Sequence, residues 1–430
     1  MSTLPSETAW LCLAVMAALG GLVLCQLKMS SGQVRRKVVC LGGLWGGACL
    51  LSLSLFWGLV LFSLSCFLLY IYLSGQELLP VDQKAVLITE SFAGMSSSHS
   101  PPLQPAGSEG KYRVWMEVNR GFPSSQRNRV GGSDSGFGHA LSKYLDQLGF
   151  TVFAGVLDEN GPGAEQLRRT CSKHLCVLQM DVTNPQQIKD AYSTVVQKVQ
   201  NRGLWAVINN AGILSLPADG ELIPMSHYKQ CMAVNFFGAV EVTKAFLPLL
   251  RKSKGRLVNV SSMAGEIPFL KLAAYGSSKA ALTMFSAIMR QELAKWEVKV
   301  SIIQPGGFKT NITGTREMLE KLEKDMLDYL TPDVQEEYGQ DYILAQRRFL
   351  TSLHVHSSSD ISPVLLDIQH AISAKSPSTL YTPGPGTYLW LCFFNFSPTS
   401  IFDYFNKKFF NSDVSMPRTL SMPNQKNEVM

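Results

Sequence analysis

Residues 132–158 read Gly-Ser-Asp-Ser-Gly-Phe-Gly-His-Ala-Leu-Ser-Lys-Tyr-Leu-Asp-Gln-Leu-Gly-Phe-Thr-Val-Phe-Ala-Gly-Val-Leu-Asp. Three glycines, Gly132, Gly136 and Gly138, lead into a stretch of helical period, and a β-branched run then ends at Asp158. Glycines at such a turn let the backbone approach a pyrophosphate at the helix N-terminus, and a carboxylate about 20 residues further on can bind an adenosine ribose. The stretch predicts a dinucleotide-binding unit. Taken alone, it also fits an ordinary turn with a solvated carboxylate.

The alternation of strand and helix patterns continues along the chain. Short β-branched runs, typical of strands buried on both faces, occupy 85–89, 150–154, 177–181, 205–209, 256–260 and 298–303. Stretches of helical period separate them at 139–148, 188–199, 228–250 and 273–294. This order predicts an α/β fold, a Rossmann-type doubly wound parallel sheet whose ligands bind beyond the carboxyl ends of the strands.

Two apolar runs, residues 10–27 and 38–73, precede the first strand. A bilayer core needs about 20 apolar residues per helix, so residues 1–80 are expected to form a membrane anchor of one to three spans. Four cations in the loop 28–37 place that loop on the cytosolic side. A signal peptide is the poorer interpretation, because no Lys or Arg precedes the first run. Three spans would leave the following domain in the cytosol, and a single long second span would leave it in the lumen.

Composition excludes two classes of function. The formal net charge is +6 at pH 7, without a long basic run, and we expect no nucleic-acid partner. The nine cysteines show neither metal-ligand spacing nor a disulfide framework, so no metal site is expected.

A second cluster, Tyr275-Gly-Ser-Ser-Lys279, falls on a predicted helix. Its spacing of four places both side chains on one face, where an ammonium can lower the pKa of a phenol. Such a phenolate can take the proton of an alcohol. Ser262, which follows the strand at 256–260, is expected at the same sheet edge. An isolated Tyr-Lys pair of this kind is more often a surface pair. The prediction of a catalytic site therefore depends on Ser262 lying beside it.

Further motifs follow in order: Asp181-Val-Thr183, Asn209-Asn-Ala-Gly212, Asn235 within Met232–Gly238, and Pro305-Gly-Gly-Phe-Lys-Thr310. With the glycine cluster, Ser262, Tyr275 and Lys279, they resemble the short-chain dehydrogenase/reductase family. The resemblance implies an oxidoreductase in which Tyr275 is the general acid/base and Ser262 positions the substrate oxygen.

The resemblance also implies the remaining roles. Lys279 would bind the nicotinamide ribose and lower the pKa of Tyr275, and Asn235 would hold a water of the proton relay. Asp181 would contact the adenine, and Thr310 the carboxamide. Asp158, which would repel a 2′-phosphate, favours NAD over NADP as the cofactor. The other expected cofactor residues are Gly132, Gly136, Gly138, Asn209, Gly212, Pro305 and Gly306.

Residues 74–86, 149–164 and 247–262 resemble the hydroxysteroid dehydrogenases of this family. The resemblance implies NAD-dependent oxidation of 17β-hydroxysteroids, such as estradiol to estrone and testosterone to androstenedione, with 20α-hydroxyprogestins as further substrates. It also implies the endoplasmic reticulum membrane as location, a cytosolic catalytic domain and a homodimer. Oxidation of 11β-hydroxysteroids or of retinol is the alternative activity.

The glycine turn departs from the family pattern. In the family a strand ending in Thr runs directly into the turn, whereas here 42 residues, Glu90–Gly131, follow Thr89. They are rich in Ser, Pro and Gly, a composition that predicts disorder. Since the insertion leaves from the turn that must lie against the pyrophosphate, a folded but catalytically dead protein is the second hypothesis.

The expected organisation is a membrane anchor at 1–80, the Rossmann domain at 81–385 and an apolar, aromatic segment at 386–430. Residues 318–353 are expected to form a helical substrate lid. Residues 388–396 are too few to span a bilayer, so an interfacial helix and a core segment both remain open.

Overall fold

The computed structural model describes residues 64, 65, 67, 78, 79, 84–90, 136–200, 202–310, 312, 316–346, 349, 357–410 and 416–421. The chain divides into two compact units, one of Met1–Leu79 with Ser373–Pro377 and one of Pro80–Ile372 with Ser378–Met430. The expected membrane spans fall almost entirely outside the described residues, as do Gly132 and the insertion after Glu90. The segment 386–430 belongs to the second unit, together with the expected Rossmann domain.

The second unit is built on a seven-stranded sheet of order β3-β2-β1-β4-β5-β6-β7. Neighbouring strands all pair in parallel. From the central pair β1 and β4 the chain proceeds outward in both directions, so the switch point lies between them, where ligands of such folds bind. The strands are β1 (Ala85–Thr89), β2 (Thr151–Val156), β3 (Leu175–Gln179), β4 (Ala206–Asn209), β5 (Arg256–Val260), β6 (Lys299–Ile303) and β7 (Leu380–Tyr381).

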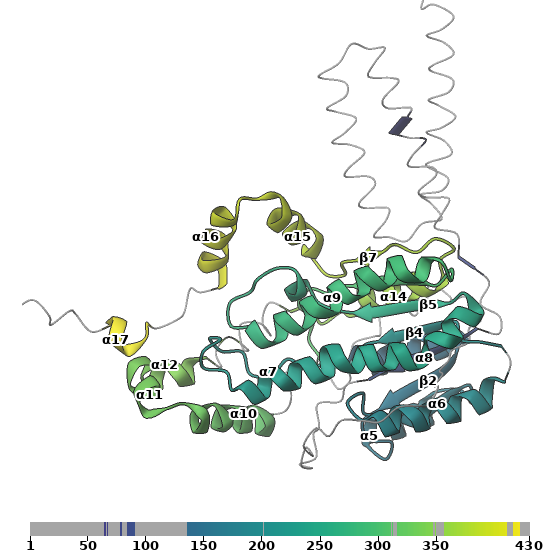
Figure 1. Ribbon diagram of the computed structural model, residues 1–430, viewed down its shortest axis with the longest axis horizontal. Coiled ribbons are helices and arrows are strands. Elements are labelled where there is room, and N and C mark those ends of the chain that lie inside the picture. Colours follow the sequence, from purple (N-terminus) through teal and green to yellow (C-terminus); the bar gives the residue numbers. More distant parts are fainter. Residues whose placement is uncertain are drawn as a thin grey trace, which may run out of the picture. The chain divides into compact units, whose positions relative to one another are not determined.

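Helices cover both faces of this sheet (Figure 1). One face carries α4 (Phe137–Gln147), α5 (Pro162–Thr170) and α14 (Ser362–Ser373), and Tyr144 of α4 donates a hydrogen bond of 2.6 Å to Gln369 of α14. The other face carries α6 (Pro185–Val199), α8 (Ala239–Ser253) and α9 (Ala273–Ala294). Because both faces are covered, every residue of β1 is buried.

The predicted fold class is confirmed. Each expected strand lies within two residues of its predicted position, and α9 has the predicted bounds. The structure adds β7, whose two residues are too few to show a period, and α5, α14 and α16 (Thr399–Phe410), which the sequence analysis did not identify.

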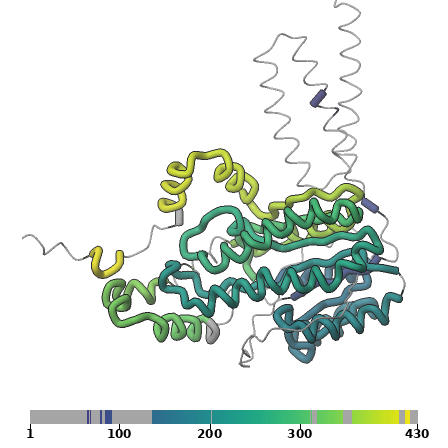
Figure 2. The backbone as a smooth tube through the Cα atoms, viewed as in Figure 1, coloured from purple at the N-terminus to yellow at the C-terminus, as the bar shows by residue number. Residues whose placement is uncertain are grey.

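A single long rod crosses the second face. α7 (Met225–Met232), the π-helical turn η2 (Ala233–Gly238) and α8 run continuously beside α9 (Figure 2). By length and composition this rod, Met225–Ser253, is the one described helix that could cross a membrane, yet half of its apolar window is buried inside the protein. Its contacts with β4, β5 and α9 are those of a core helix.

Shorter elements surround the carboxyl edge of the sheet. They are η3 (Met263–Gly265), α10 (Arg316–Tyr329), α11 (Pro332–Tyr338), α12 (Gln340–Ala345), α15 (Thr387–Phe396), α16 and α17 (Arg418–Ser421). The expected helical lid thus corresponds to α10, α11 and α12.

Candidate active site

The carboxyl ends of the strands meet around a small pocket of about 100 Å³ that is open to solvent. Eight of the predicted site residues line it, from five separate segments of the chain: Gly136, Gly212, Ser262, Tyr275, Lys279, Pro305, Gly306 and Thr310. The pocket is also lined by Phe137, Asn210, Val260, Ser261, Phe308 and Ile312.

Tyr275 lies in the first turn of α9 and is 8% exposed. Ser262, at the end of β5, hydrogen-bonds to its side chain and accepts a bond of 3.2 Å from the Ala264 amide. Burial raises the pKa of Tyr275 to about 12, and the Ser262 hydrogen bond offsets part of that rise. A phenol paired with a hydroxyl at this edge can exchange a proton with a substrate oxygen.

Lys279 lies one turn further along α9 and is 2% exposed. Its Nζ donates a hydrogen bond of 2.9 Å to the carbonyl of Val260 and lies 5.9 Å from the centre of the Tyr275 ring. Burial lowers the pKa of Lys279 to about 8. Burial is the largest influence on the pKa of Tyr275, and the expectation that Lys279 lowers this pKa stays a prediction.

Asn235 lies behind the pocket, fully buried in the π-helical turn η2. Its Oδ1 accepts a bond of 2.8 Å from the Ile213 amide, and its Nδ2 donates to the Ile213 carbonyl at 2.9 Å. Nδ2 also donates to Ser278 Oγ, at 2.9 Å, and Ser278 donates to the Tyr275 carbonyl, at 2.7 Å. Asn235 therefore joins the loop after β4 to the catalytic turn of α9. Its expected contact with a water stays a prediction.

Asn209 and Asn210, at the end of β4, point to opposite faces of the sheet. Asn210 Nδ2 donates 3.0 Å to the Thr89 carbonyl, and Thr89 Oγ1 accepts from the Asn210 amide at 2.9 Å. Asn209 Nδ2 instead donates to Thr243 at 2.9 Å and to Asn259 at 2.8 Å, deep between sheet and helix. Asn210, not the predicted Asn209, thus lines the pocket, since successive side chains of a strand point to opposite faces.

The start of α4 packs tightly against the end of β1. A Cβ on Gly138 would lie 2.6 Å from Glu90 Cγ and 2.7 Å from Asn210 Nδ2, so only glycine fits. Glu90 Oε1 accepts a bond of 2.7 Å from Ser142 Oγ, while Oε2 is buried and has no hydrogen-bond partner among the described residues. Burial raises the pKa of Glu90 to about 7. A carboxyl group therefore stands where the fold brings a pyrophosphate to the helix N-terminus.

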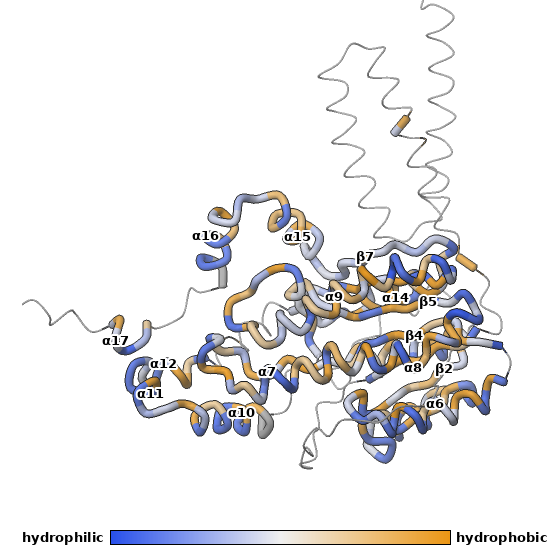
Figure 3. The backbone as a smooth tube through the Cα atoms, in the orientation of Figure 1, coloured by the Kyte–Doolittle hydropathy of each residue, from blue (hydrophilic) through white to orange (hydrophobic). Residues whose placement is uncertain are grey.

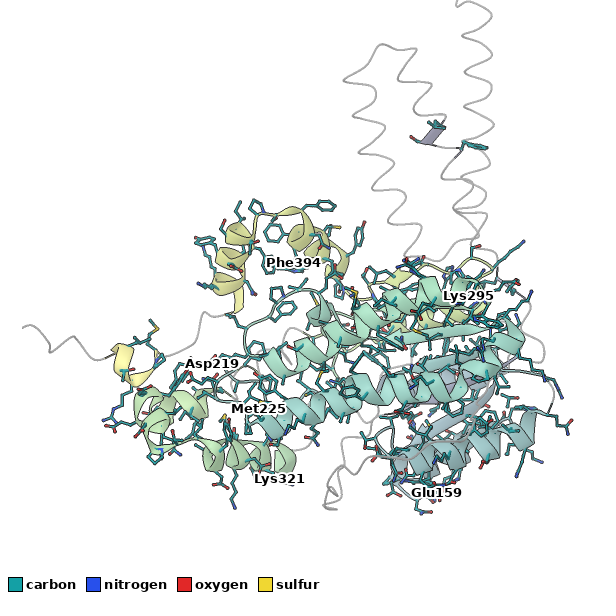
Figure 4. All side chains as sticks on the ribbon, in the orientation of Figure 1. Glu159, Asp219, Met225, Lys295, Lys321 and Phe394 are labelled. Carbon is teal, nitrogen blue, oxygen red and sulfur yellow. The ribbon has the colours of Figure 1, made fainter. Side chains whose placement is uncertain are left out.

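Two predicted carboxylates lie at the strand ends outside the pocket. Asp158 is exposed after β2 and accepts a 2.9 Å bond from the Asn160 amide. Asp181, after β3, accepts from the amide and the hydroxyl of Thr183, both at 2.8 Å. Figure 4 shows the neighbouring Glu159 at this outer side of the sheet. Both positions suit the adenosine end of a dinucleotide that crosses the sheet edge.

A second apolar cluster adjoins Tyr275. It joins the loop after β4, the start of α9 and the lid helices, and its buried members include Leu214, Leu216, Cys231, Leu272, Tyr275, Leu322, Met326 and Ile343. Ile312 and Phe269 pack against it. Tyr275 and Ile312 belong both to this cluster and to the lining of the pocket, so the cluster adjoins the pocket.

The lid helices are held to the loop after β4 by polar contacts. Tyr338 donates 2.8 Å to Glu221, and Tyr342 donates 2.5 Å to Asp219, which Figure 4 labels beside these helices. Both hydrogen bonds raise the pKa of the phenol concerned, with burial the larger cause for Tyr342. α11 and α12 are thus fixed to the loop after β4, which contributes Leu214 and Leu216 to the apolar cluster.

The residues that line the pocket suit contact with the nicotinamide half of a dinucleotide. Glycines make its walls where a ligand must come close to the backbone, and a Cβ on Gly212 would lie 3.1 Å from Lys279 Nζ. The edge-to-face pair Phe137 and Phe308, 5.6 Å between ring centres, closes one side. These two aromatics and Asn210 were not among the site residues predicted from the sequence, although the alternation of side chains along a strand indicates that only one asparagine of the pair faces the pocket.

Comparisons with known proteins agree with this geometry. A model of the short chain dehydrogenase family matches residues 129–320. A Homo sapiens protein named 17-beta-hydroxysteroid dehydrogenase type 2 is 61% identical over 426 residues, 99% of each chain. A Bos taurus 11-beta-hydroxysteroid dehydrogenase type 2 is 44% identical over 295 residues, 68% of this chain and 72% of the bovine one.

Among solved structures, a short-chain dehydrogenase from Streptomyces avermitilis superposes with a TM-score of 0.50 at 22% identity, over 66% of this chain and 96% of that one. At that identity the likeness bears on the fold alone. The sequence relatives, with the Ser262, Tyr275 and Lys279 arrangement at the sheet edge, show that the chain is an oxidoreductase that belongs to the short chain dehydrogenase family.

Proposed function

We propose that this protein oxidises the 17β-hydroxyl of steroids with NAD, converting estradiol to estrone and testosterone to androstenedione, with 20α-hydroxyprogestins as further substrates. The observation that carries the proposal is the buried apolar cluster that includes Tyr275 and side chains of the lid helices. A steroid is rigid and apolar with few polar atoms, and such a wall suits it. The names of the two hydroxysteroid relatives support the same substrate class.

The reaction needs a base at the hydroxyl and a hydride acceptor at the carbon. Ser262 positions the hydroxyl oxygen, and Tyr275, hydrogen-bonded to Ser262, takes the proton of that hydroxyl in its ionised, phenolate form. Lys279 lies on the same helix face, and its side chain donates a hydrogen bond to the Val260 carbonyl. Its positive charge would stabilise the negative charge of the Tyr275 phenolate. NAD, when bound, supplies the hydride acceptor, and Gly212, Gly306 and Thr310 would hold its nicotinamide end.

The choice of NAD over NADP rests on Asp158 at the end of β2, with Asp181 as the adenine contact. An exposed carboxylate there accepts bonds from a ribose and repels a 2′-phosphate. Asp158→Ala should weaken NAD binding and relax discrimination against NADP. The neighbouring exposed Asn160→Ala is the control. If the NAD-to-NADP preference stays unchanged, another group selects the cofactor.

The substrate is tested on the purified full chain in detergent with NAD, by following NADH. Estradiol and testosterone should be oxidised with higher kcat/KM than the 11β-hydroxysteroid cortisol or retinol. A preference for cortisol would transfer the assignment to 11β-hydroxysteroid oxidation, and a preference for retinol to retinol oxidation. Either result contradicts the proposal.

A catalytically dead protein is the second candidate, and one observation favours it. The buried Glu90 carboxyl lies against Gly138, where the diphosphate of NAD would approach α4. A folded protein that does not bind NAD would show no thermal stabilisation by saturating NAD, whereas mass action requires a rise in Tm for a protein that binds it.

Two further properties belong to the proposal. A homodimer would cover the apolar side chains Phe237, Met284 and Ile288, which η2 and α9 leave 54%, 62% and 46% exposed. The other is location in the endoplasmic reticulum membrane with the catalytic domain in the cytosol, for which the apolar runs before residue 75 support membrane insertion. A glycosylation sequon engineered after residue 421 should stay unmodified in microsomes, and its modification would place the domain in the lumen.

A further inference from the structure

We propose that the C-terminal hairpin, α15 (Thr387–Phe396) with α16 (Thr399–Phe410), lies on the surface of a lipid bilayer with anionic headgroups. This inference goes beyond the proposed reaction, and its test does not depend on catalysis. It starts from the large apolar side chains that the described residues leave exposed, several of which belong to these two short helices. Figure 3 shows hydrophobic residues along α15 and in part of α16.

The inward face of the hairpin packs against the loop after β5. Leu391 of α15 and Phe402 of α16 form a buried cluster with Ile267 of the loop after β5, and Phe393 and Phe394 pack against it. Figure 4 labels Phe394 on this hairpin. Asn406 adds a 2.8 Å hydrogen bond to the Pro268 carbonyl. Because both helices turn these residues toward the same loop, their opposite faces point away from the protein.

The outward face is apolar on both helices. Ile401 and Tyr404 of α16 are 45% and 62% exposed, and their spacing of i and i+3 places them on one stripe. On α15, Leu389 and Phe396 are 71% and 86% exposed and lie seven residues apart, again on one side. Exposed apolar patches of this kind mark interaction surfaces.

The charges beside the stripe indicate which partner covers it. Lys408 lies seven residues after Ile401, on the apolar stripe itself, and Lys407 adjoins it. Asp403 falls on the opposite side of the helix by the same spacing. A face of aromatic and aliphatic side chains that also carries lysines, whose long side chains can reach the headgroups, is typical of helices that lie in a membrane interface. A helix of ten residues such as α15 is too short to span.

The same chain also carries two apolar segments that are long enough to insert in a bilayer. Residues 10–27 and 38–73 are apolar runs of spanning length, so their insertion would tether the second unit to the membrane. A tethered surface of low intrinsic affinity binds because its local concentration is high. This favours lipid over a second copy of the chain as the partner of the hairpin.

Docking of the hairpin would bear directly on the active site. Glu266 accepts a hydrogen bond of 2.9 Å from Asn395 of α15 and one of 3.1 Å from Gln304, the residue before the pocket-lining Pro305. Thr387, the first residue of α15, leaves no room for a side chain at the pocket residue Gly306. A bilayer under this hairpin would therefore lie next to the pocket, where an apolar substrate dissolved in lipid can enter.

The test uses the full chain in nanodiscs of phosphatidylcholine with phosphatidylserine. Benzoylphenylalanine replaces Phe396 or Tyr404 in separate variants, and Gln197, exposed on α6, is the matched control. After irradiation we expect at least about fivefold more phospholipid adduct at 396 and 404 than at 197. Phospholipid adducts equal to the control, or adducts to a second copy of the chain, would overturn the proposal.

The charge component is tested separately with Lys407→Gln combined with Lys408→Gln. Phospholipid adduct at 396 should fall by about fivefold per lysine in anionic nanodiscs. In pure phosphatidylcholine the same double variant should match the parent. An equal fall in both lipids would mean that the substitutions damage the hairpin rather than its attraction to headgroups, and would contradict the anionic surface.

Discussion

The side chain of Asn235 binds both backbone polar groups of Ile213, accepting from its amide at 2.8 Å and donating to its carbonyl at 2.9 Å. Asn235 can reach the loop because the helix widens to a π-turn at Ala233–Gly238. The same amide then bonds Ser278, which bonds the carbonyl of Tyr275. A single side chain thus sets the distance between the loop after β4 and the catalytic turn.

Asn235→Leu should lower both stability and turnover. Leu keeps the volume but removes the hydrogen bonds to the half-buried amide and carbonyl of Ile213, each of which contributes about 0.5–1.5 kcal/mol. We expect a lower Tm and a fall in kcat that exceeds the change in steroid KM, because Tyr275 is displaced while the apolar wall remains. Ser286→Ala, which also removes a buried hydrogen bond in α9, is the control for stability alone. Equal kcat in Asn235→Leu and Ser286→Ala would contradict the positioning role.

Tyr275→Phe should abolish steroid oxidation while leaving the fold intact. The substitution removes the proton acceptor and relieves the cost of burying a hydroxyl, so Tm should not fall. Loss of general base catalysis alone is worth about 10²–10⁴-fold in rate. Residual NADH formation above a few per cent, measured at saturating steroid, would show that another group takes the proton.

Lys279→Met should stabilise the protein in a pH-dependent way. Burial lowers the pKa of Lys279 from 10.5 to about 8, so the folded state disfavours the ammonium, and the cost is fully present below pH 8. It disappears as pH rises from 8 to 10.5, where the unfolded chain also loses the proton. The gain should be about 3 kcal/mol at pH 7 and less than about 1 kcal/mol at pH 10. Thermal unfolding at both pH values measures it, and a gain independent of pH would mean that packing, not charge, is responsible.

Glu90→Gln should also stabilise the protein, and the gain should be larger at high pH than at low pH. Burial raises the pKa of Glu90 from 4.5 to about 7, so the carboxylate destabilises the fold above pH 7, and this cost vanishes as pH falls to 4.5. The neutral amide should add about 3 kcal/mol to the free energy of unfolding at pH 8 and less than about 1 kcal/mol at pH 5. Equal gains at pH 8 and pH 5 would exclude an ionised carboxylate at this position.

Deletion of Glu90–Gly131 should increase NAD affinity at least about tenfold, or about 1.4 kcal/mol, because Thr89 then leads directly into the glycine turn. Glu90→Gln separates two causes of any gain. If the single substitution recovers most of it, the buried carboxyl excludes the diphosphate. If only the deletion does, the rest of the insertion is responsible. Equal NAD binding by all three proteins, titrated in the same detergent, would contradict the prediction.

Local patterns in the sequence determined the fold class and the central chemistry. The spacing of Tyr275 and Lys279 puts both on one helix face wherever α9 lies, and β-branched runs separated by helical stretches permit few other arrangements than a parallel sheet. Ser262 follows from the same logic, because the ends of parallel strands meet at one edge. These features depend on backbone period alone, and the structure reproduces them.

Only the tertiary structure decided which of Asn209 and Asn210 faces the pocket, that Asn235 binds Ile213, and that Glu90 is buried against Gly138. Each of these depends on contacts between segments distant in the chain, whose geometry no local period encodes. The pKa of Tyr275 is the clearest case: the sequence indicated a neighbouring ammonium, but burial by the surrounding fold sets the direction of the shift. The outward face of the C-terminal hairpin likewise became visible only when Leu391 and Phe402 were found packed on Ile267, which leaves the opposite side chains to solvent or lipid.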